Sequence, residues 1–140
     1  MSAAHGGGPG ERTTRTARLW IGGDGVARVI LAHGCEQARA DAEAVIRALE
    51  SLLGEGRRRP TLFDYRFMKS MERGARAYHA GPETARVASA VAILVGSPVS
   101  RLIGTFVMGM NKPHVPTRLF TSEPDALAWL AGFVEPIAQT

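Results

Sequence analysis

Residues 88–110, "ASAVAILVGSPVSRLIGTFVMGM", decide the fold class. The first nine residues are the most apolar strand candidate of the chain, which is typical of a strand buried on both faces in a parallel sheet. Ser97 then suits a helix N-cap, Pro98 suits the first helical position, and apolar residues recur at helical spacing up to Met110. The stretch therefore predicts a central strand that leads into an amphipathic helix.

The same alternation of strand and helix extends in both directions. Upstream, two β-rich runs flank Asp24-Gly25, which is a hairpin signal. The expected elements are a hairpin over 16–32, a helix within 36–56, a strand over 61–65, a helix from about Met71 to His79, a helical turn at Pro82, the strand and helix of 88–110, a strand over 117–121 and a helix capped by Ser122. This order predicts an α/β fold with crossover connections, a mainly parallel sheet and helices packed on it.

The chain is expected to form one domain. At 140 residues it is long enough to bury its own core, and no second domain or internal repeat is visible. Residues 1–14 are small, polar and glycine-rich, so we expect a flexible tail there and a single domain over 15–140. No apolar run approaches the roughly 18 residues that span a bilayer. The one cysteine, Cys35, cannot form an internal disulfide, which suits a reducing cytoplasm.

Several classes of function are disfavoured by composition and spacing. The net charge is +4, but the arginines are scattered and no aromatic residues interleave them to stack bases, so no nucleic-acid partner is expected. The run Arg57–Arg59 is interpreted as a solvated loop rather than a phosphate-binding patch. The four histidines show no metal-ligand spacing, and no nucleophile, base and orienting group can be assembled. We expect no metal, no cofactor and no enzymatic activity.

Two stretches carry a resemblance to a known family, namely "SAVAILVGSPVSRLIGTFVMGMNKP" at 89–113 and "PTRLFTSEPDALAWL" at 116–130. From about Arg18 to Phe133 the chain resembles the STAS or SpoIIAA-like domains, which share the fold of anti-sigma-factor antagonists. It is most similar to a bacterial group of small stand-alone proteins of unknown function related to them. The resemblance implies an N-terminal hairpin followed by β-α repeats in which each strand lies beside the last. It also implies that the connection after "LFDY" (62–65) is the signalling site.

Switchable antagonists of this fold carry a pattern like Met-Asp-Ser-Ser-Gly at the start of the helix after this connection, and a kinase phosphorylates the second serine. The matching residues here are "MERGA" (71–75), which put Gly74 where the phosphorylated serine stands. The classical phosphoserine switch is therefore not expected. Ser70 precedes the helix, and its simplest role is the N-cap.

The same connection is a candidate partner-binding site on the strength of the resemblance. Its residues are Asp64, Lys69, Ser70, Glu72, Arg73 and Gly74. Asp64 ends a strand, where functional residues of α/β sheets are commonly found. Two interpretations of Asp64 stay open, because it either takes part in partner binding or bonds backbone groups of the loop.

The helix over 98–110 offers a second candidate surface. Its apolar stripe, predicted to face the core, consists of Val99, Leu102, Ile103, Phe106, Val107 and Met110. The opposite face has a single charge, Arg101, and small residues beside a methionine, a low-relief surface that another chain could approach closely. We expect Arg101, Gly104, Thr105 and Met108 to lie in a homodimer or against a partner protein. The alternative is that this face is ordinary solvent surface.

The sequence thus favours a cytoplasmic, non-enzymatic module of STAS-like fold that regulates by protein–protein contact. The alternative belongs to another class of function. Related folds include lipid carriers, and an apolar helix beside a sheet could open a cleft for a small apolar molecule.

Overall fold

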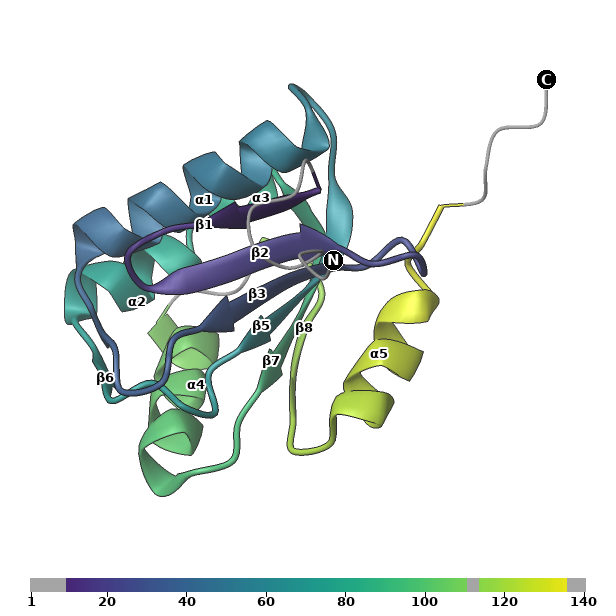
Figure 1. Ribbon diagram of the computed structural model, residues 1–140. Helices are drawn as coiled ribbons and strands as arrows, with labels where there is room; N and C mark the ends of the chain where they lie inside the picture. The colour runs from purple at the N-terminus through teal and green to yellow at the C-terminus, as the bar shows by residue number, and fades with distance from the viewer. Residues whose placement is uncertain (1–9, 111–113, 136–140) are drawn as a thin grey trace, which may run out of the picture.

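The computed structural model describes residues 10–110 and 114–135, which form a sheet covered by helices on both faces (Figure 1). The strands are β1 (Glu11–Thr13), β2 (Ala17–Ile21), β3 (Ala27–Leu31), β4 (Glu36–Gln37), β5 (Arg59–Asp64), β6 (Ser70–Met71), β7 (Ala88–Leu94) and β8 (Thr117–Phe120). The helices are α1 (Arg39–Leu53), α2 (Arg73–His79), α3 (Pro82–Ala85), α4 (Pro98–Met110) and α5 (Glu123–Ala131).

The main sheet has the strand order β1-β2-β3-β5-β7-β8. The first three strands are antiparallel and the last four are mutually parallel, so each strand of the β-α part lies beside the one before it. Strand β7 lies between β5 and β8, and its residues from Ala90 to Leu94 are buried. The central parallel strand, the hairpin and the β-α order expected from the sequence are therefore confirmed.

One face of the sheet packs against four helices. Helix α1 buries its apolar stripe there, including Val45, Ile46 and Leu49, and α2 and α4 contribute further residues to the same core. The N-terminus of α1 is held by Asp41, whose carboxylate accepts a hydrogen bond of 2.8 Å from the backbone N–H of Ala38 and pairs with Arg15. Hydrogen bonding from Arg15 lowers the pKa of the Asp41 carboxyl.

The other face is covered by α5, which stands apart from the other helices in Figure 1. Ala126 and Leu130 of α5 pack on Leu62, Ala92 and other buried residues of that face. Ser122 caps the helix, because its hydroxyl accepts a hydrogen bond of 3.3 Å from the backbone N–H of Asp125, as the sequence predicted.

The expected tail over 1–14 needs one correction. Glu11–Thr13 form β1, which pairs with β2 in antiparallel register. Glu11 is buried, and its carboxylate accepts a hydrogen bond of 3.1 Å from Arg18 in β2, which helps to hold β1 on the sheet. Residues 1–9 lie outside the described part of the chain. Among residues 10–110 and 114–135, no helix has both the length and the apolar character that crossing a membrane requires.

Candidate functional site

The candidate signalling site is the connection between β5 and α2, at the carboxyl end of the parallel strands. It is not an open loop. Strand β6 pairs with β4 in parallel, with Ser70 opposite Glu36 and Met71 opposite Gln37. Backbone hydrogen bonds extend this pairing on its N-terminal side, from Gly34 N–H to the Phe67 carbonyl at 2.7 Å and from Lys69 N–H to the Cys35 carbonyl at 2.8 Å. The connection is therefore held by backbone hydrogen bonds against the segment that precedes α1.

Asp64 begins this connection and organises it. Its side chain is buried, and one carboxylate oxygen accepts from the backbone N–H and from the Nε of Arg66, both at 3.0 Å. The other oxygen accepts from Nη2 of Arg66 at 2.8 Å. The Arg66 guanidinium also lies 3.6 Å from Glu123 at the start of α5. Asp64 thus forms hydrogen bonds within the loop, which is one of the two interpretations that the sequence left open. The other, that Asp64 takes part in partner binding, stays a prediction.

The residues that Asp64 helps to place were missed by the sequence reasoning. Phe67 is half-exposed, its ring is 6.0 Å from the ring of His33 in a stacked arrangement, and the Arg66 guanidinium lies 5.0 Å from its centroid. An arginine two residues after an acid at a strand end was the signal that could have identified this pair. The site therefore also presents the Arg66 guanidinium and the Phe67 ring, neither of which was among the candidate residues named from the sequence.

The prediction that Ser70 caps α2 is wrong. Ser70 lies in β6, and α2 begins at Arg73 with Glu72 as its N-cap residue, without a side-chain capping bond. The backbone N–H of Ser70 points to the Cys35 carbonyl at 3.3 Å, so pairing with the segment before α1 delays the helix. Lys69 lies 3.4 Å from Glu36 in an exposed ion pair. Glu72 and Arg73 are exposed at the start of α2.

Gly74, which matches the phosphorylated serine of the switchable antagonists, lies against α1. A Cβ atom at this position would stand 3.2 Å from Cβ of Arg39, which is tighter than ordinary side-chain contacts. Arg39 is itself held by a hydrogen bond of 2.9 Å to Glu43 and lies over the ring of Tyr78, 5.2 Å from its centroid. Because the position of the Arg39 Cβ atom is fixed by the backbone of α1, a serine at residue 74 would require α1 and α2 to separate by a few tenths of an ångström.

Helix α4 is turned relative to the sequence prediction. Gly104, expected on the outer face, is buried together with Ser100, Ile103 and Val107. A Cβ atom on Gly104 would lie 2.9 Å from Cδ2 of Leu119. Because glycine has no side chain, the helix backbone can approach the sheet closely at this point. Gly104 is therefore a packing residue, and its assignment to an interface is wrong.

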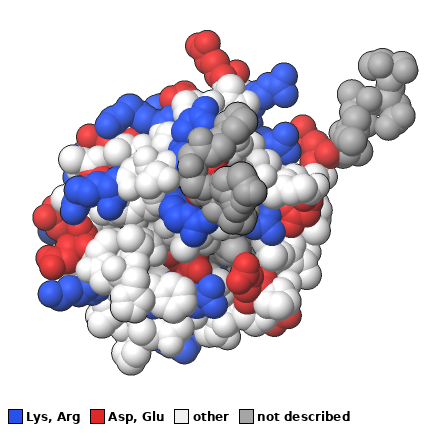
Figure 2. Space-filling view, viewed as in Figure 1, with Lys and Arg blue, Asp and Glu red and all other residues white. Residues whose placement is uncertain are grey.

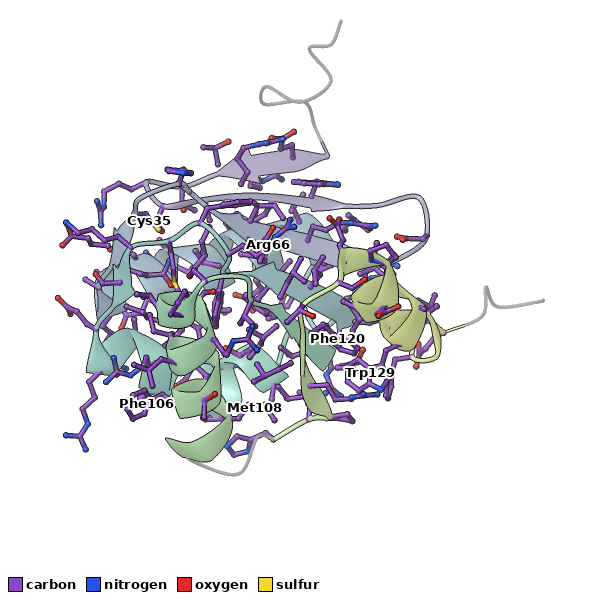
Figure 3. All side chains as sticks on the ribbon, turned by 90° about the horizontal axis from the view of Figure 1, so that it is seen from below. Cys35, Arg66, Phe106, Met108, Phe120 and Trp129 are labelled. Atoms are coloured by element: carbon purple, nitrogen blue, oxygen red, sulfur yellow. The ribbon has the colours of Figure 1, made fainter. Side chains whose placement is uncertain are left out.

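Small residues on the inner side of α4 leave apolar ones on the outer side. Val99, Leu102 and Phe106 are 46%, 58% and 47% exposed, although their spacing had predicted that they face the core. We call these three residues the α4 face. Figure 3 shows Phe106 standing off α4 on the side away from α5. Arg101 and Thr105 are exposed as expected, and Met108 is half-buried.

The α4 face lies beside the candidate signalling site. The guanidinium of Arg76, on α2, lies 5.0 Å from the Phe106 ring centroid and donates a hydrogen bond of 2.6 Å to the carbonyl of Met71 in β6. Arg76 thus joins the outer side of α4 to the β6–α2 connection. In Figure 2 the lower part of the molecule, over α4, is largely free of charged side chains.

A buried polar chain runs behind the site. The Gln37 amide nitrogen donates to Oγ1 of Thr16 at 3.1 Å, and the Gln37 oxygen lies 2.6 Å from Nε2 of His79. Nε2 therefore carries the proton, and Nδ1 of His79 is buried without a hydrogen-bond partner among the described residues. Burial lowers the pKa of His79 to about 4, so this histidine is neutral at pH 7.

A small cavity adjoins His79 and is lined by Phe63, Tyr65 and Val107, among others. Its volume of about 20 Å³ is enough for one water molecule and far too small for a lipid chain. The cavity therefore does not support the alternative of an apolar ligand.

Two further features concern Cys35 and metal binding. Burial raises the pKa of the Cys35 thiol, which disfavours the nucleophilic thiolate form. Within the described part of the chain, no three His, Cys, Asp or Glu side chains converge in a way that could hold a metal ion.

Comparison with known proteins agrees with this architecture. Residues 19–134 match a family model described as a domain of unknown function, DUF7793. No curated protein matches the chain. Among solved structures, an uncharacterized protein of the DUF3478 family with a SpoIIAA-like fold, from Shewanella loihica PV-4, is 16% identical, with a TM-score of 0.53 over 86% of this chain and 90% of that one.

Two further solved structures are similar. The anti-sigma factor antagonist SpoIIAA in its unphosphorylated form is 12% identical, with a TM-score of 0.53 over 83% of this chain and 98% of that one. A protein of unknown function from Arthrobacter sp. FB24 is 39% identical over 81% of this chain and 97% of its own, with a TM-score of 0.33. The chain has a SpoIIAA-like, STAS-like fold, and it belongs to the family defined by the domain of unknown function DUF7793.

Proposed function

We propose that this chain is a non-enzymatic regulatory module that binds a protein partner through the α4 face. One observation carries the proposal: Val99, Leu102 and Phe106 are all about half-exposed on one side of a single helix. Scattered apolar residues on a surface need no explanation, but a contiguous apolar patch commonly marks a contact with another molecule. The patch includes the aromatic ring of Phe106, and aromatic residues are enriched in the energetically dominant part of interfaces.

The neighbouring β6–α2 connection completes the proposed surface. It supplies exposed polar residues, namely Lys69, Glu72 and Arg73, around an apolar centre, the usual arrangement of a protein interface. Burying the exposed part of each α4-face side chain contributes on the order of 1 kcal/mol. Three such residues favour a reversible contact of moderate affinity, which suits a regulatory module.

The likeness to SpoIIAA agrees with this proposal but does not carry it. That protein is named as an anti-sigma factor antagonist, so one protein of this fold acts on another protein. In the present chain Gly74 has no hydroxyl and packs on Arg39. We therefore propose that partner binding is controlled without a phosphoserine at this position.

Paired substitutions test the α4 face. Leu102→Glu with Phe106→Glu adds two charges to exposed positions, so the fold should persist by circular dichroism. The matched control is Ala128→Glu with Ala131→Glu, which adds the same charge to exposed positions of α5 on the other side of the sheet. Tagged versions of the parent and both variants are used to capture proteins from the native host, with identification by mass spectrometry.

We expect a defined partner to be captured by the parent and by the α5 control, and lost from the α4 variant. A homodimer would appear as parent self-association in light scattering that the α4 variant alone abolishes. Equal capture by all three proteins, together with equal self-association, contradicts the proposal and identifies the α4 face as ordinary surface.

A further inference from the structure

We infer that a basic cleft at the opposite end of the sheet binds an organic phosphate. The cleft lies at the amino ends of β5 and β7, far along the strands from the β6–α2 connection, and has a volume of about 550 Å³, within the range of small-molecule sites. Its lining includes Arg57, Arg58, Arg59, Ser89, Phe133 and Glu135. The turn between β2 and β3 lies beside the chain that follows α5 (Figure 1), and Gly25 and Val134 both line the cleft.

The arginines of the cleft have an uncompensated charge. Five other arginines form ion pairs with acidic side chains, namely Arg15, Arg18, Arg28, Arg39 and Arg66. In contrast, Arg57, Arg58 and Arg59 have no carboxylate within ion-pair distance in residues 10–110 and 114–135. Glu135 also lines the cleft, so three cations face one anion there. A bound anion would relieve the repulsion among three successive guanidinium groups.

Two of these side chains are held in place by backbone groups. Arg58 donates a hydrogen bond from Nη2 to the Ala88 carbonyl, and Arg59 donates one from Nη1 to the Gly25 carbonyl, both at 3.3 Å. A guanidinium has five N–H donors, so each side chain keeps donors for a ligand. Because these planar groups are already positioned, they can engage phosphate oxygens in pairs with less loss of side-chain freedom.

Part of the cleft lining is apolar. Phe133 and Val134 follow α5 and line the cleft together with Pro60. The Phe133 ring is steadied by an edge contact with Trp129, with centroids 4.9 Å apart. A ligand that fills this space therefore needs both a phosphate for the arginines and an apolar portion for the Phe133 side. The sequence alone had favoured a solvated loop, because it could not show that Phe133 lines the same cleft as Arg57–Arg59.

Titration with phenyl phosphate tests the cleft directly. In amide-resolved NMR of the intact chain, we expect saturable shifts concentrated at Gly25, Gly56, Ser89 and Phe133. Inorganic phosphate should bind more weakly, and benzyl alcohol should produce no saturable shift. Arg57→Gln with Arg58→Gln should weaken phenyl phosphate binding at least about tenfold, because two charge-assisted contacts are removed. The matched control is Arg47→Gln with Arg101→Gln, two exposed arginines elsewhere, and it should bind like the parent.

A second arm identifies the source of the phosphate. Co-sedimentation with phosphatidylglycerol vesicles, against phosphatidylcholine vesicles, reports a lipid headgroup as the ligand, whereas phenyl phosphate binding without vesicle binding reports a soluble ester. Either result supports the site when it depends on Arg57 and Arg58. If the control pair Arg47→Gln with Arg101→Gln weakens binding as much as Arg57→Gln with Arg58→Gln does, the ligand is attracted only by the overall positive charge, and the proposed site is overturned. Absence of binding in both arms, or equal affinity for inorganic and phenyl phosphate, also overturns it.

This proposal is independent of the α4 face. The arginine pair should leave partner capture unchanged, and the Leu102→Glu and Phe106→Glu pair should leave phenyl phosphate binding unchanged.

Discussion

Gly104 of α4 lies directly against Leu119 of β8, so close that a Cβ atom on the glycine would stand 2.9 Å from Cδ2 of the leucine. The same atom would lie 3.1 Å from Cγ1 of Val95. This contact sets the rotation of α4 on the sheet. It buries the side of the helix that carries Ser100 and Gly104, and it leaves Val99, Leu102 and Phe106 outside.

Gly104→Ala should therefore destabilise the protein although alanine favours helix. The overpacking of a well-packed contact costs about 1–3 kcal/mol, which exceeds the gain of up to about 1 kcal/mol in helix propensity. Gly109→Ala is the matched control, because it lies in the same helix and nothing is within 4 Å of its Cβ position. We expect urea denaturation to show a lower free energy of unfolding for the first variant and a higher one for the second. Stabilisation by both would show that α4 does not approach the sheet this closely.

Asp64→Asn should lower stability. The buried carboxylate accepts three hydrogen bonds from Arg66, and a hydrogen bond to a charged group contributes about 1.5–3 kcal/mol. The amide cannot accept on both sides, because one of its two ends is a donor. Urea denaturation of Asp64→Asn, Arg66→Gln and the double variant measures the coupling between the two side chains. A coupling energy near zero, with weaker partner binding in both single variants, would favour a role for this pair in recognition rather than in folding.

Stability should fall as the pH is lowered from about 6.5 toward 4. Burial lowers the pKa of His79 from 6.5 to about 4, so the unfolded chain takes up a proton in this range before the folded protein does. The stabilisation is fully present above pH 6.5, is lost progressively as the pH falls through this window, and amounts to on the order of 3 kcal/mol.

The difference between the parent and His79→Gln isolates this effect from the titration of carboxyl groups. Denaturation at several pH values should give a steeper loss of stability for the parent between pH 6.5 and 4. His33→Gln, at an exposed histidine, should follow the parent curve. If His79→Gln has the same pH dependence as the parent, His79 is not buried in its neutral form.

Ser70→Ala should be nearly neutral, within about 0.5 kcal/mol, as is usual for a substitution away from caps and cores. Ser70 belongs to β6 and does not cap α2. Ser122→Ala provides the contrast, because the Ser122 hydroxyl does cap α5, and losing such a cap typically costs about 1 kcal/mol. Thermal unfolding of both variants shows whether Ser122→Ala destabilises the protein more than Ser70→Ala does. A loss at Ser70 as large as that at Ser122 would restore Ser70 as a helix cap.

The sequence by itself determined the class of the fold and the succession of its longer elements, from β2 to α5, but not the short strands β1, β4 and β6. The apolar run of β7, the hairpin turn at Asp24-Gly25 and the cap at Ser122 depend on periodicity and on interactions within a few residues. Such local preferences depend only on residues that are close together in the sequence. For the same reason the connection between β5 and α2 could be located from the sequence, whereas its role as a signalling site is implied only by the resemblance to STAS domains.

Only the tertiary structure decided which surfaces these elements present. Either of two stripes of α4 could have packed on the sheet. The contact of Gly104 with Leu119 of β8 placed the stripe that carries Gly104 on the inside. Ser70 was drawn into β6 by pairing with the segment before α1, against its local preference for a cap. Arg57–Arg59 and Phe133 share a cleft although they are far apart in the chain. Long-range packing and strand pairing determine these features, and no local pattern in the sequence encodes them.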